Sequence, residues 1–295
     1  MYMQTRGEKV FSFVNYILLF IICVVTLYPL WHVAIASISD PILVYAKRGF
    51  YLWPLGNPTL KGYSLVFDNP NIVSGYLNTL FYVVVGTLLS MFVTILGAYV
   101  LSRKGLYWNK VVMALIIFYM YFQGGLIPFF LMVKNMGLMD SRWAVILPTV
   151  VNTWNLIVMR TSFTTVPDSL IESAKLDGAS DWRIVWVIAV PVLQATVAVI
   201  ALFYAVGRWN EWFNPSLFLT SKNKFPLQVI LREILLENST QSMTQLGVVG
   251  QSEQQSYRLL VKYCTIMVAT VPILLVYPFL QRYFIHGVMI GSIKG

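Results

Sequence analysis

Long apolar runs dominate the pattern along this chain, and most polar residues fall between them. A helix needs about 20 mainly apolar residues to cross a bilayer. Six stretches reach that length, so the pattern predicts an all-α, polytopic transmembrane bundle with about six spans. The predicted spans are Val10–Ala36, Gly75–Leu101, Val111–Val133, Trp143–Thr161, Val185–Phe213 and Leu259–Phe284.

The third and fourth of these spans are the least regular. Gly124, Gly125 and Pro128 interrupt the third, and Pro148 and Asn152 lie in the fourth. Broken helices survive at membrane depth where neighbouring helices or a water-filled cavity satisfy the freed backbone groups. Both spans therefore stay in the prediction, with interrupted helices expected.

Two long connecting segments, residues 37–73 and 214–258, are predicted to lie outside the cytoplasm. A short amphipathic helix is predicted over Pro226–Glu237, where apolar residues recur at helical spacing. Those apolar residues are Leu227, Ile230, Leu231, Ile234 and Leu235. Such a helix could lie on the membrane surface, cover a pore mouth, or pack on the protein's own outer face.

Composition supports a membrane protein. Hydrophobic residues make up 58% of the chain and charged residues only 11%, whereas a soluble domain typically carries about 25% charged residues. The net charge is +9, but the Lys and Arg residues are scattered singly between apolar runs. That distribution fits anionic lipid head groups and not nucleic acid.

Arg6 and Lys9 precede the first span, whose apolar run is longer than the 7–15 residues of a signal-peptide core. We therefore expect an uncleaved first helix. An even number of spans places both termini on one side of the membrane. The basic N-terminal arm favours the cytoplasm, although the Lys and Arg residues otherwise divide evenly between the two sides.

Chemistry-bearing motifs are few. Cys23 and Cys264 lie in apolar runs and are expected to be packing residues, while His32 and His286 lie far apart, so no metal site is predicted. The chain has no G-x-x-x-x-G-K-[ST] phosphate loop, so it is not an ATP-hydrolysing subunit. The predicted spans also hold no catalytic set, which argues against an enzyme.

The connection between the fourth and fifth spans, residues 162–184, is the informative segment. Pro167 and Asp168 suit a helix start, and Gly178 suits a C-terminal left-handed turn. Between them, Leu170, Ile171, Ala174 and Leu176 form a narrow apolar stripe. The pattern predicts a short helix with a fixed end, followed by a second helix that begins near Ser180.

This segment resembles the conserved cytoplasmic loop of binding-protein-dependent ABC importer permeases, in which E-A-A, G and I-x-L-P recur at fixed spacing. Glu172-Ser173-Ala174, Gly178 and Ile188-Ala189-Val190-Pro191 match that pattern, with small departures at Ser173 and Val190. The segments Gly125–Leu131, Gly137–Asp140 and Trp209–Trp212 and the closing Gly291–Gly295 also resemble carbohydrate permeases. The nearest resemblance is to the maltose-type second permease subunit, in its oligo- and polysaccharide branch.

The resemblance implies a type I ABC importer permease fold, with residues 1–295 as one transmembrane domain in a bacterial cell membrane. It implies four kinds of partner besides membrane lipid: a second permease subunit, an ATP-binding subunit dimer, an extracytoplasmic solute-binding protein and a carbohydrate. ATP would be bound by the partner ATPase, with no cofactor on this chain. The loop helix would be the coupling helix, which places that loop and both termini in the cytoplasm. The residues implied in ATPase coupling are Glu172, Ser173, Ala174, Asp177, Gly178, Gly291 and Gly295.

Polar and aromatic residues at membrane depth are candidates for the substrate pathway, since such groups usually face a cavity or a partner helix. The candidates are Asn152, Trp154, Asn155, Gln194, Tyr204, Arg208, Trp209 and Asn210. Trp and Tyr also form interfacial belts, and Asn can join helices together, so both explanations stay open. Arg208 is expected to pair with Glu211 or with water.

Other functions make different demands on the sequence. A permease for a non-sugar solute would share the coupling loop, so the substrate is less constrained than the mechanism. A secondary transporter would show internal repeats and buried carboxylates for ion coupling, and neither is evident here.

Overall fold

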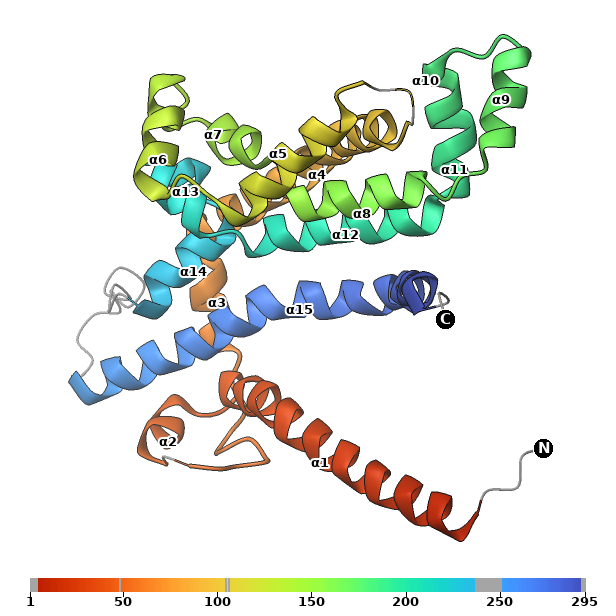
Figure 1. Cartoon of the computed structure of the whole chain (residues 1–295). Coiled ribbons are helices and arrows are strands. Elements are labelled where there is room, and N and C mark those ends of the chain that lie inside the picture. The colour runs from red at the N-terminus through yellow and green to blue at the C-terminus, as the bar shows by residue number, and fades with distance from the viewer. Residues whose placement is uncertain (1–4, 48, 104, 106, 237–250, 293–295) are drawn as a thin grey trace. The chain divides into compact units, whose positions relative to one another are not determined.

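The computed structural model describes residues 5–47, 49–103, 105, 107–236 and 251–292 (Figure 1). Helices form the regular structure of these ranges, and no strand occurs within them, so the all-α prediction is confirmed. The chain divides into two compact units, residues 1–70 with 231–272 and residues 71–230 with 273–295.

The first unit contains α1 (Arg6–Ser37), α2 (Pro41–Ala46), α3 (Lys61–Phe67) and the first part of α15 (Gln251–Ser292). A capping box starts α1. Thr5 Oγ1 accepts a hydrogen bond from the Glu8 amide, and the Glu8 carboxylate accepts one from the Thr5 amide. Two amides that the helix itself leaves without partners are thus satisfied by the local sequence.

Helices α3 and α15 approach closely at Gly62. A Cβ atom there would lie 2.5 Å from Cys264 Sγ, so only glycine fits without a shift. Cys264 is buried, as predicted for a packing residue. Cys23 is exposed instead, because α1 buries none of its apolar spanning window inside the protein.

The second unit contains the other helices, from α4 to the start of α14. They are α4 (Pro70–Ser102), α5 (Asn109–Tyr121), α6 (Leu126–Asn135), α7 (Arg142–Ile146), η1 (Leu147–Thr149), α8 (Thr153–Phe163), α9 (Asp168–Leu176), α10 (Asp181–Arg183), η2 (Ile184–Ala189), α11 (Val190–Val192), α12 (Gln194–Asn210), α13 (Phe213–Phe218), η3 (Lys222–Lys224) and α14 (Leu227–Leu236).

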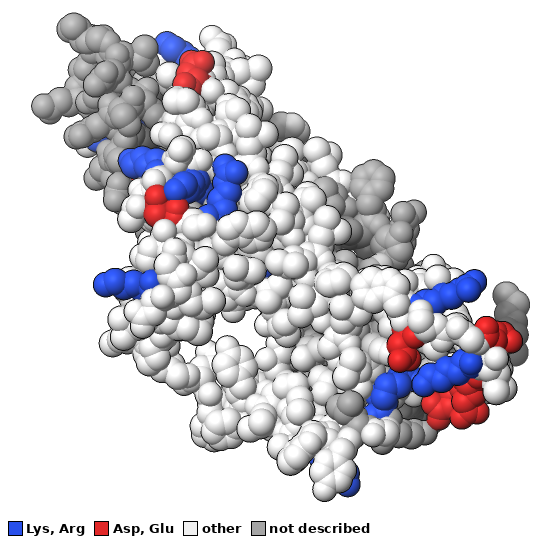
Figure 2. Space-filling model, turned by 90° about the horizontal axis from the view of Figure 1, so that it is seen from above, with Lys and Arg blue, Asp and Glu red and all other residues white. Residues whose placement is uncertain are grey.

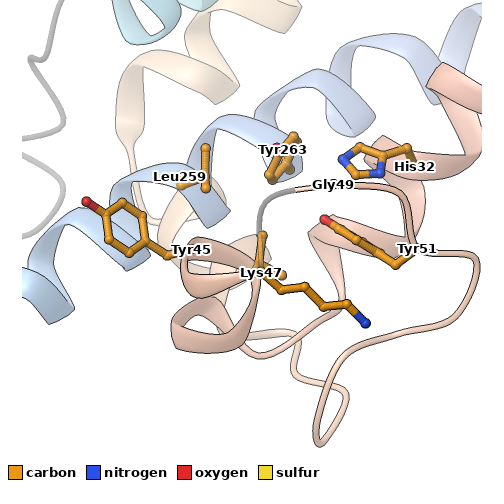
Figure 3. Close-up of a pocket in the computed structure, with 8 residues that line it drawn as sticks. His32, Tyr45, Lys47, Gly49, Tyr51, Leu259 and Tyr263 are labelled. Carbon is orange, nitrogen blue, oxygen red and sulfur yellow. The ribbon is translucent and has the colours of Figure 1, made fainter.

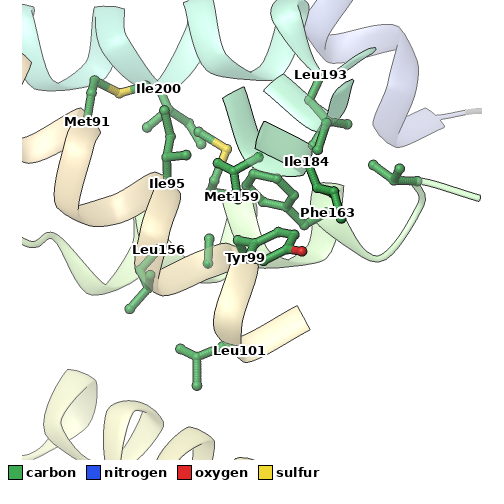
Figure 4. Close-up of a cluster of buried hydrophobic side chains, with 14 of the residues drawn as sticks. Met91, Ile95, Tyr99, Leu101, Leu156, Met159, Phe163, Ile184, Leu193 and Ile200 are labelled. Atoms are coloured by element: carbon green, nitrogen blue, oxygen red, sulfur yellow. The ribbon is translucent and has the colours of Figure 1, made fainter. Parts of the chain in front are cut away.

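A cluster of buried apolar side chains joins α4, α8, η2 and α12 (Figure 4). It includes Met91, Ile95, Tyr99, Leu156, Met159, Phe163, Ile184 and Ile200. Met159, Ile184 and Ile200 are fully enclosed. Because four segments share this core, they are expected to move together as one body.

Three helices are each long and apolar enough to cross a membrane: Arg6–Ser37, Pro70–Ser102 and Gln255–Leu275. They correspond to the predicted first, second and sixth spans. Two helix pairs pass the same test together, α5 with α6 and α10–α11 with α12, and they correspond to the third and fifth. The predicted fourth span is divided among α7, η1 and α8. About six spans is consistent with this arrangement.

The third span bends by 115° between α5 and α6. Gly125 lies at this break with φ of +82°, a backbone conformation that glycine adopts far more readily than other residues. The interruption predicted from the glycine pair is therefore confirmed.

The fifth predicted span, Val185–Phe213, is present as a bent helix pair, and the sequence analysis did not predict its bend. The helix bends by 90° between Val192 and Gln194 and ends at Asn210. Pro191 precedes the bend, and proline lacks an amide donor and crowds the carbonyl four residues earlier. The turn before it, η2, is a π-helix.

The predicted amphipathic helix is α14, Leu227–Leu236. Its start packs on α4: a Cβ atom on Gly75 would lie 2.5 Å from Ile230 Cδ1, and the Leu227 amide donates to Thr79 Oγ1 at 2.8 Å. The apolar face is buried within the protein, so of the three alternatives α14 packs on the protein's own surface. The following residues 237–250 lie outside the described ranges.

Candidate coupling helix and translocation pathway

The helix predicted in the 162–184 connection is α9, Asp168–Leu176, with Pro167 at its N-cap and Asp177 at its C-cap. The Ala179 amide donates to the Ala174 carbonyl at 2.9 Å, and the Gly178 amide donates to the Lys175 carbonyl at 3.0 Å. These two bonds form a Schellman motif, which ends a helix at a fixed residue.

Gly178 sits in that motif with φ of +76°. No atom lies within 4 Å of the position that its Cβ would take. Glycine is therefore required by the backbone conformation and not by lack of space, as predicted.

Helix α9 has two distinct faces. Ile171 and Ala174 are buried in the core cluster together with Phe163 and Ile184. Leu176, by contrast, is 90% exposed. The predicted apolar stripe is thus divided between a face that anchors α9 to the protein and a face that is open.

The open face also carries the polar residues of the matched motif. Glu172, Ser173, Lys175 and Asp177 are exposed, and Ser173 Oγ donates to the Ser169 carbonyl at 2.8 Å. Apolar and charged groups therefore lie side by side on one short helix surface.

The end of α4 is tied to the start of α10 beside this helix. Tyr99 Oη donates to Asp181 Oδ1 at 3.0 Å, and the Arg103 guanidinium lies 4.4 Å from the centre of the Tyr99 ring. A cavity of about 540 Å³ lies here, lined by these residues and by Glu172 and Lys175 of α9. In Figure 2, acidic and basic side chains gather at the end of the face where α9, α10 and the end of α4 lie.

The candidate pathway residues fall into two groups. Some are joined by a hydrogen-bond network, and the others lie outside it. Tyr204 of α12 is buried, and its hydroxyl shares a hydrogen bond with Thr94 Oγ1 at 2.8 Å and accepts one from the Asn152 amide at 3.0 Å. Asn152 Oδ1 accepts from the Asn155 amide at 3.1 Å as the N-cap of α8. The structure thus brings Asn152, Asn155 and Tyr204 together where they join α4, α8 and α12.

The other candidates are not part of that network. Trp154 is 59% exposed. The ring of Trp209 lies 6.4 Å from that of Tyr76, while Asn210 is exposed and its side chain donates to the Val206 carbonyl at 2.9 Å. Gln194 is also exposed.

Arg208 is buried. It was expected to pair with Glu211 or with water, but its guanidinium donates to other groups of the protein instead. Its Nη1 donates to the Val145 carbonyl at 2.8 Å and Thr149 Oγ1 at 2.9 Å. Its Nη2 donates to the Thr149 carbonyl at 3.1 Å, the Ile146 carbonyl at 3.3 Å and Ser90 Oγ at 3.4 Å. Glu211 instead accepts from the Asn214 amide at 3.2 Å.

The guanidinium of Arg208 therefore satisfies carbonyls at the end of α7 and in η1, which are left without helical partners. A cation at a helix C-terminus also interacts favourably with the helix dipole. Arg208 holds the broken fourth span against α4 and α12.

Sequence reasoning missed a second cluster, centred on Asp140 between α6 and α7. Oδ1 of this residue accepts from the Thr220 and Ser221 amides at 3.0 and 2.9 Å, and Lys224 Nζ lies 2.9 Å from Oδ2. The Lys224 ammonium, together with Ser221 and Thr220, holds the pKa of the Asp140 carboxyl well below its usual range.

Asp140 lies in the Gly137–Asp140 segment that resembles carbohydrate permeases, but its partners lie about 80 residues further along the chain. No local spacing could have identified them. The cluster fixes the connection after α6 to the segment that leads into α14.

Comparison with known proteins identifies the family. The chain is 39% identical over 290 residues to the polygalacturonan/rhamnogalacturonan transport system permease protein YtcP of Bacillus subtilis (strain 168), covering 98% of this chain and 99% of that protein. It is 36% identical over 295 residues to the protein LplC of the same organism, covering 99% and 97%. No protein-family model matches the chain.

A solved structure shows the same fold. The chain resembles a bacterial ABC transporter involved in the import of the acidic polysaccharide alginate, with a TM-score of 0.85 and 30% identity over 96% of this chain and 100% of that one. YtcP is a transport system permease protein and the solved structure is that of an ABC transporter, a class distinct from the secondary transporters considered above. This chain is a membrane protein that belongs to the permease family of carbohydrate ABC importers, as its coupling-loop motif implied.

Proposed function

We propose that this permease forms half of the pathway through which a bacterial importer takes up an oligo- or polysaccharide. The support for the substrate is the set of relatives, one named for polygalacturonan and rhamnogalacturonan and another for alginate. If this permease carried a non-sugar solute, its pathway would have to differ from the pathways of both of these relatives.

The proposed partners are a second permease subunit, two copies of an ATP-binding subunit and an extracytoplasmic solute-binding protein. In this arrangement the ATPase binds ATP, and this chain carries no cofactor and no catalytic residue. Helix α9 and both termini lie in the cytoplasm of a bacterial cell, and residues 37–73 and 214–258 lie outside.

The observation that carries the coupling proposal is the pair of faces on α9. Ile171 and Ala174 fix one face in the core shared with α4, α8 and α12. The other face presents Glu172 and Leu176 to a partner. A push on the open face is therefore transmitted as rigid-body movement of the attached spans.

The coupling residues then have distinct roles. Glu172, Ser173 and Asp177 contact the ATPase, and Gly178 fixes where the helix ends. Ala174 faces the protein's own core, so its small size lets α9 pack closely there. Gly291 lies in α15 and Gly295 lies outside the described residues; both are proposed to reach the ATPase.

Within the pathway, we assign sugar contact to the exposed candidates Asn152, Trp154 and Asn210. We assign the same role to Trp209, because its ring offers an apolar face to a sugar. The buried Asn155, Tyr204 and Arg208 instead position the helices that carry these groups.

The coupling proposal is tested in the complete transporter, reconstituted in proteoliposomes with its binding protein and oligogalacturonate. Glu172→Trp should abolish most substrate-stimulated ATP hydrolysis, because a bulky side chain blocks the docking face. Lys222→Trp, an equally bulky change on an exposed residue of η3, is the control and should preserve it.

Gly178 provides a second, matched pair. Gly178→Val should uncouple transport because a β-branched residue resists positive φ, whereas Gly178→Asn should largely preserve it because Asn tolerates that region. If both Glu172→Trp and Gly178→Val complexes hydrolyse ATP with normal substrate stimulation, α9 is not the coupling element.

A further inference from the structure

A cavity of about 300 Å³ lies in the first unit, apart from the groups assigned above (Figure 3). It is formed where the end of α1, the segment after α2 and α15 meet. Its main lining residues are His32, Tyr45, Lys47, Tyr51, Leu259 and Tyr263. The volume falls at the lower end of the range of about 300–1,000 Å³ that ligand pockets occupy.

Aromatic rings form the walls of this cavity. The ring centres of His32 and Tyr51 lie 4.4 Å apart, and those of His32 and Tyr263 lie 6.0 Å apart. Tyr45 Oη donates to Gln255 Oε1 at 2.7 Å, which fixes that ring at the edge. Ring faces of this kind pack well against the C–H faces of a sugar ring.

Tyr51 carries an unsatisfied polar atom into the cavity. The residue is only 6% exposed, yet its hydroxyl is buried without a hydrogen-bond partner. Figure 3 shows that hydroxyl facing the space between Lys47, Gly49 and Tyr263. A buried hydroxyl without a partner costs free energy, so a ligand atom that accepts its hydrogen bond would remove that cost.

Burial, with smaller effects of Tyr263 and Tyr28, raises the pKa of Tyr51 to about 12. The hydroxyl therefore stays protonated at physiological pH and can act as a donor. Lys47 supplies the one Lys or Arg among the described lining residues, and none of those residues is a carboxylate.

We propose that this cavity binds a uronate residue of the transported polysaccharide. The sugar ring packs against the aromatic wall that His32, Tyr51 and Tyr263 form along the cavity, a sugar oxygen accepts the Tyr51 hydrogen bond, and Lys47 pairs with the carboxylate. The proposal rests on the proposed carbohydrate function and narrows its substrate to acidic chains. Because residues 37–73 are proposed to lie outside the cytoplasm, the site is on the side from which substrate enters.

A phospholipid head group shares the negative charge but fits the cavity less well. Its phosphate has no flat apolar face to match the aromatic walls. The aromatic walls and the buried donor together therefore favour a sugar acid, and lipid becomes an outcome to be tested.

The test measures binding of trigalacturonate and of its carboxyl-reduced, uncharged counterpart to the complete transporter complex in nanodiscs. Tyr51→Phe should weaken binding of both sugars roughly five- to tenfold, the expected effect of one lost hydrogen bond. Its melting temperature should stay level or rise, because the change removes an unpaired buried hydroxyl. A purely structural Tyr51 would leave sugar binding unchanged.

Lys47→Gln should weaken binding of trigalacturonate alone and leave the uncharged sugar unaffected. Lys222→Gln makes the same charge change in η3, outside this cavity, and should affect neither. Unchanged affinities in both Tyr51→Phe and Lys47→Gln overturn the uronate site.

Two further readouts separate the alternatives. Affinity that follows the anionic lipid content of the nanodiscs, with no response to trigalacturonate, assigns the cavity to a lipid head group and overturns the proposal. Uptake of trigalacturonate by wild-type proteoliposomes is measured in parallel. Absence of uptake contradicts the proposed function, whereas normal uptake with unchanged variant affinities contradicts only the cavity.

Discussion

At the residue scale, Arg208 is a charged residue of a predicted span whose hydrogen bonds are made to other groups of the same protein. Its guanidinium gives five hydrogen bonds to α4, α7 and η1. A Cβ atom on Gly86 would lie 3.0 Å from Arg208 Nε, so the small residue on α4 makes room for the large one on α12. Small residues commonly permit such close approach between membrane helices.

We therefore expect Arg208→Met to destabilise the protein by on the order of 3 kcal/mol, since it leaves several carbonyls without donors. Thermal unfolding of the purified transporter in detergent measures the effect. Lys134→Met, which makes the same change on an exposed side chain of α6, should shift the melting temperature little. Equal shifts in the two variants would contradict the role of Arg208.

The types of residue in the pathway could be predicted from the sequence, but their partners could not. Tyr204 and Asn152 were both expected at membrane depth, yet the bond between them joins residues 52 apart, and Arg208 reaches Ser90 across 118. Such pairings depend on how the helices pack. The Glu172–Gly178 motif was more informative because its Schellman motif is made by residues adjacent in sequence.

At the element scale, apolar length predicts that a segment enters the membrane but not that it is straight. The first two spans were located within a few residues because each is a single unbroken helix. The third and fifth bend at Gly125 and after Pro191. The break in the third span was predicted from the glycine pair. Pro191, by contrast, was interpreted only as part of the family motif, so the bend in the fifth span was not predicted.

Valine substitutions at the two glycines of the third-span bend should differ in how much they destabilise the protein. Gly125→Val should cost about 1–2 kcal/mol because Gly125 has positive φ, while Gly124, where positive φ is not found, should tolerate valine better. Melting temperatures of the two variants give the comparison. A larger loss for Gly124→Val would show that space rather than backbone conformation decides this bend.

At the scale of the whole molecule, the distribution of charge bears on the orientation of the chain. On the face that Figure 2 shows, most charged side chains lie towards two ends, with single basic side chains elsewhere. Charge counting alone did not orient the chain, because Lys and Arg divide evenly between the two sides. The proposed orientation rests on α9, which is proposed to contact a cytoplasmic ATPase.

That orientation predicts which single cysteines are accessible. In a background of Cys23→Ser and Cys264→Ala, an impermeant maleimide applied to intact spheroplasts should label Lys222→Cys in η3 but not Leu176→Cys in α9. Permeabilised cells that lack the ATPase subunit should show labelling of both, because both side chains are exposed on this chain. Labelling of Leu176→Cys alone in intact cells would reverse the proposed topology.

The exposure of α1 has a consequence for how the protein is made. Its 32 residues begin with their own capping box, and its spanning window buries nothing against the rest of the chain. A membrane helix of that kind is stable in lipid before it meets any other helix. Because the N-terminal part of a chain is synthesised first, α1 can insert as soon as it leaves the ribosome and hold the nascent protein at the membrane while the bent spans are completed.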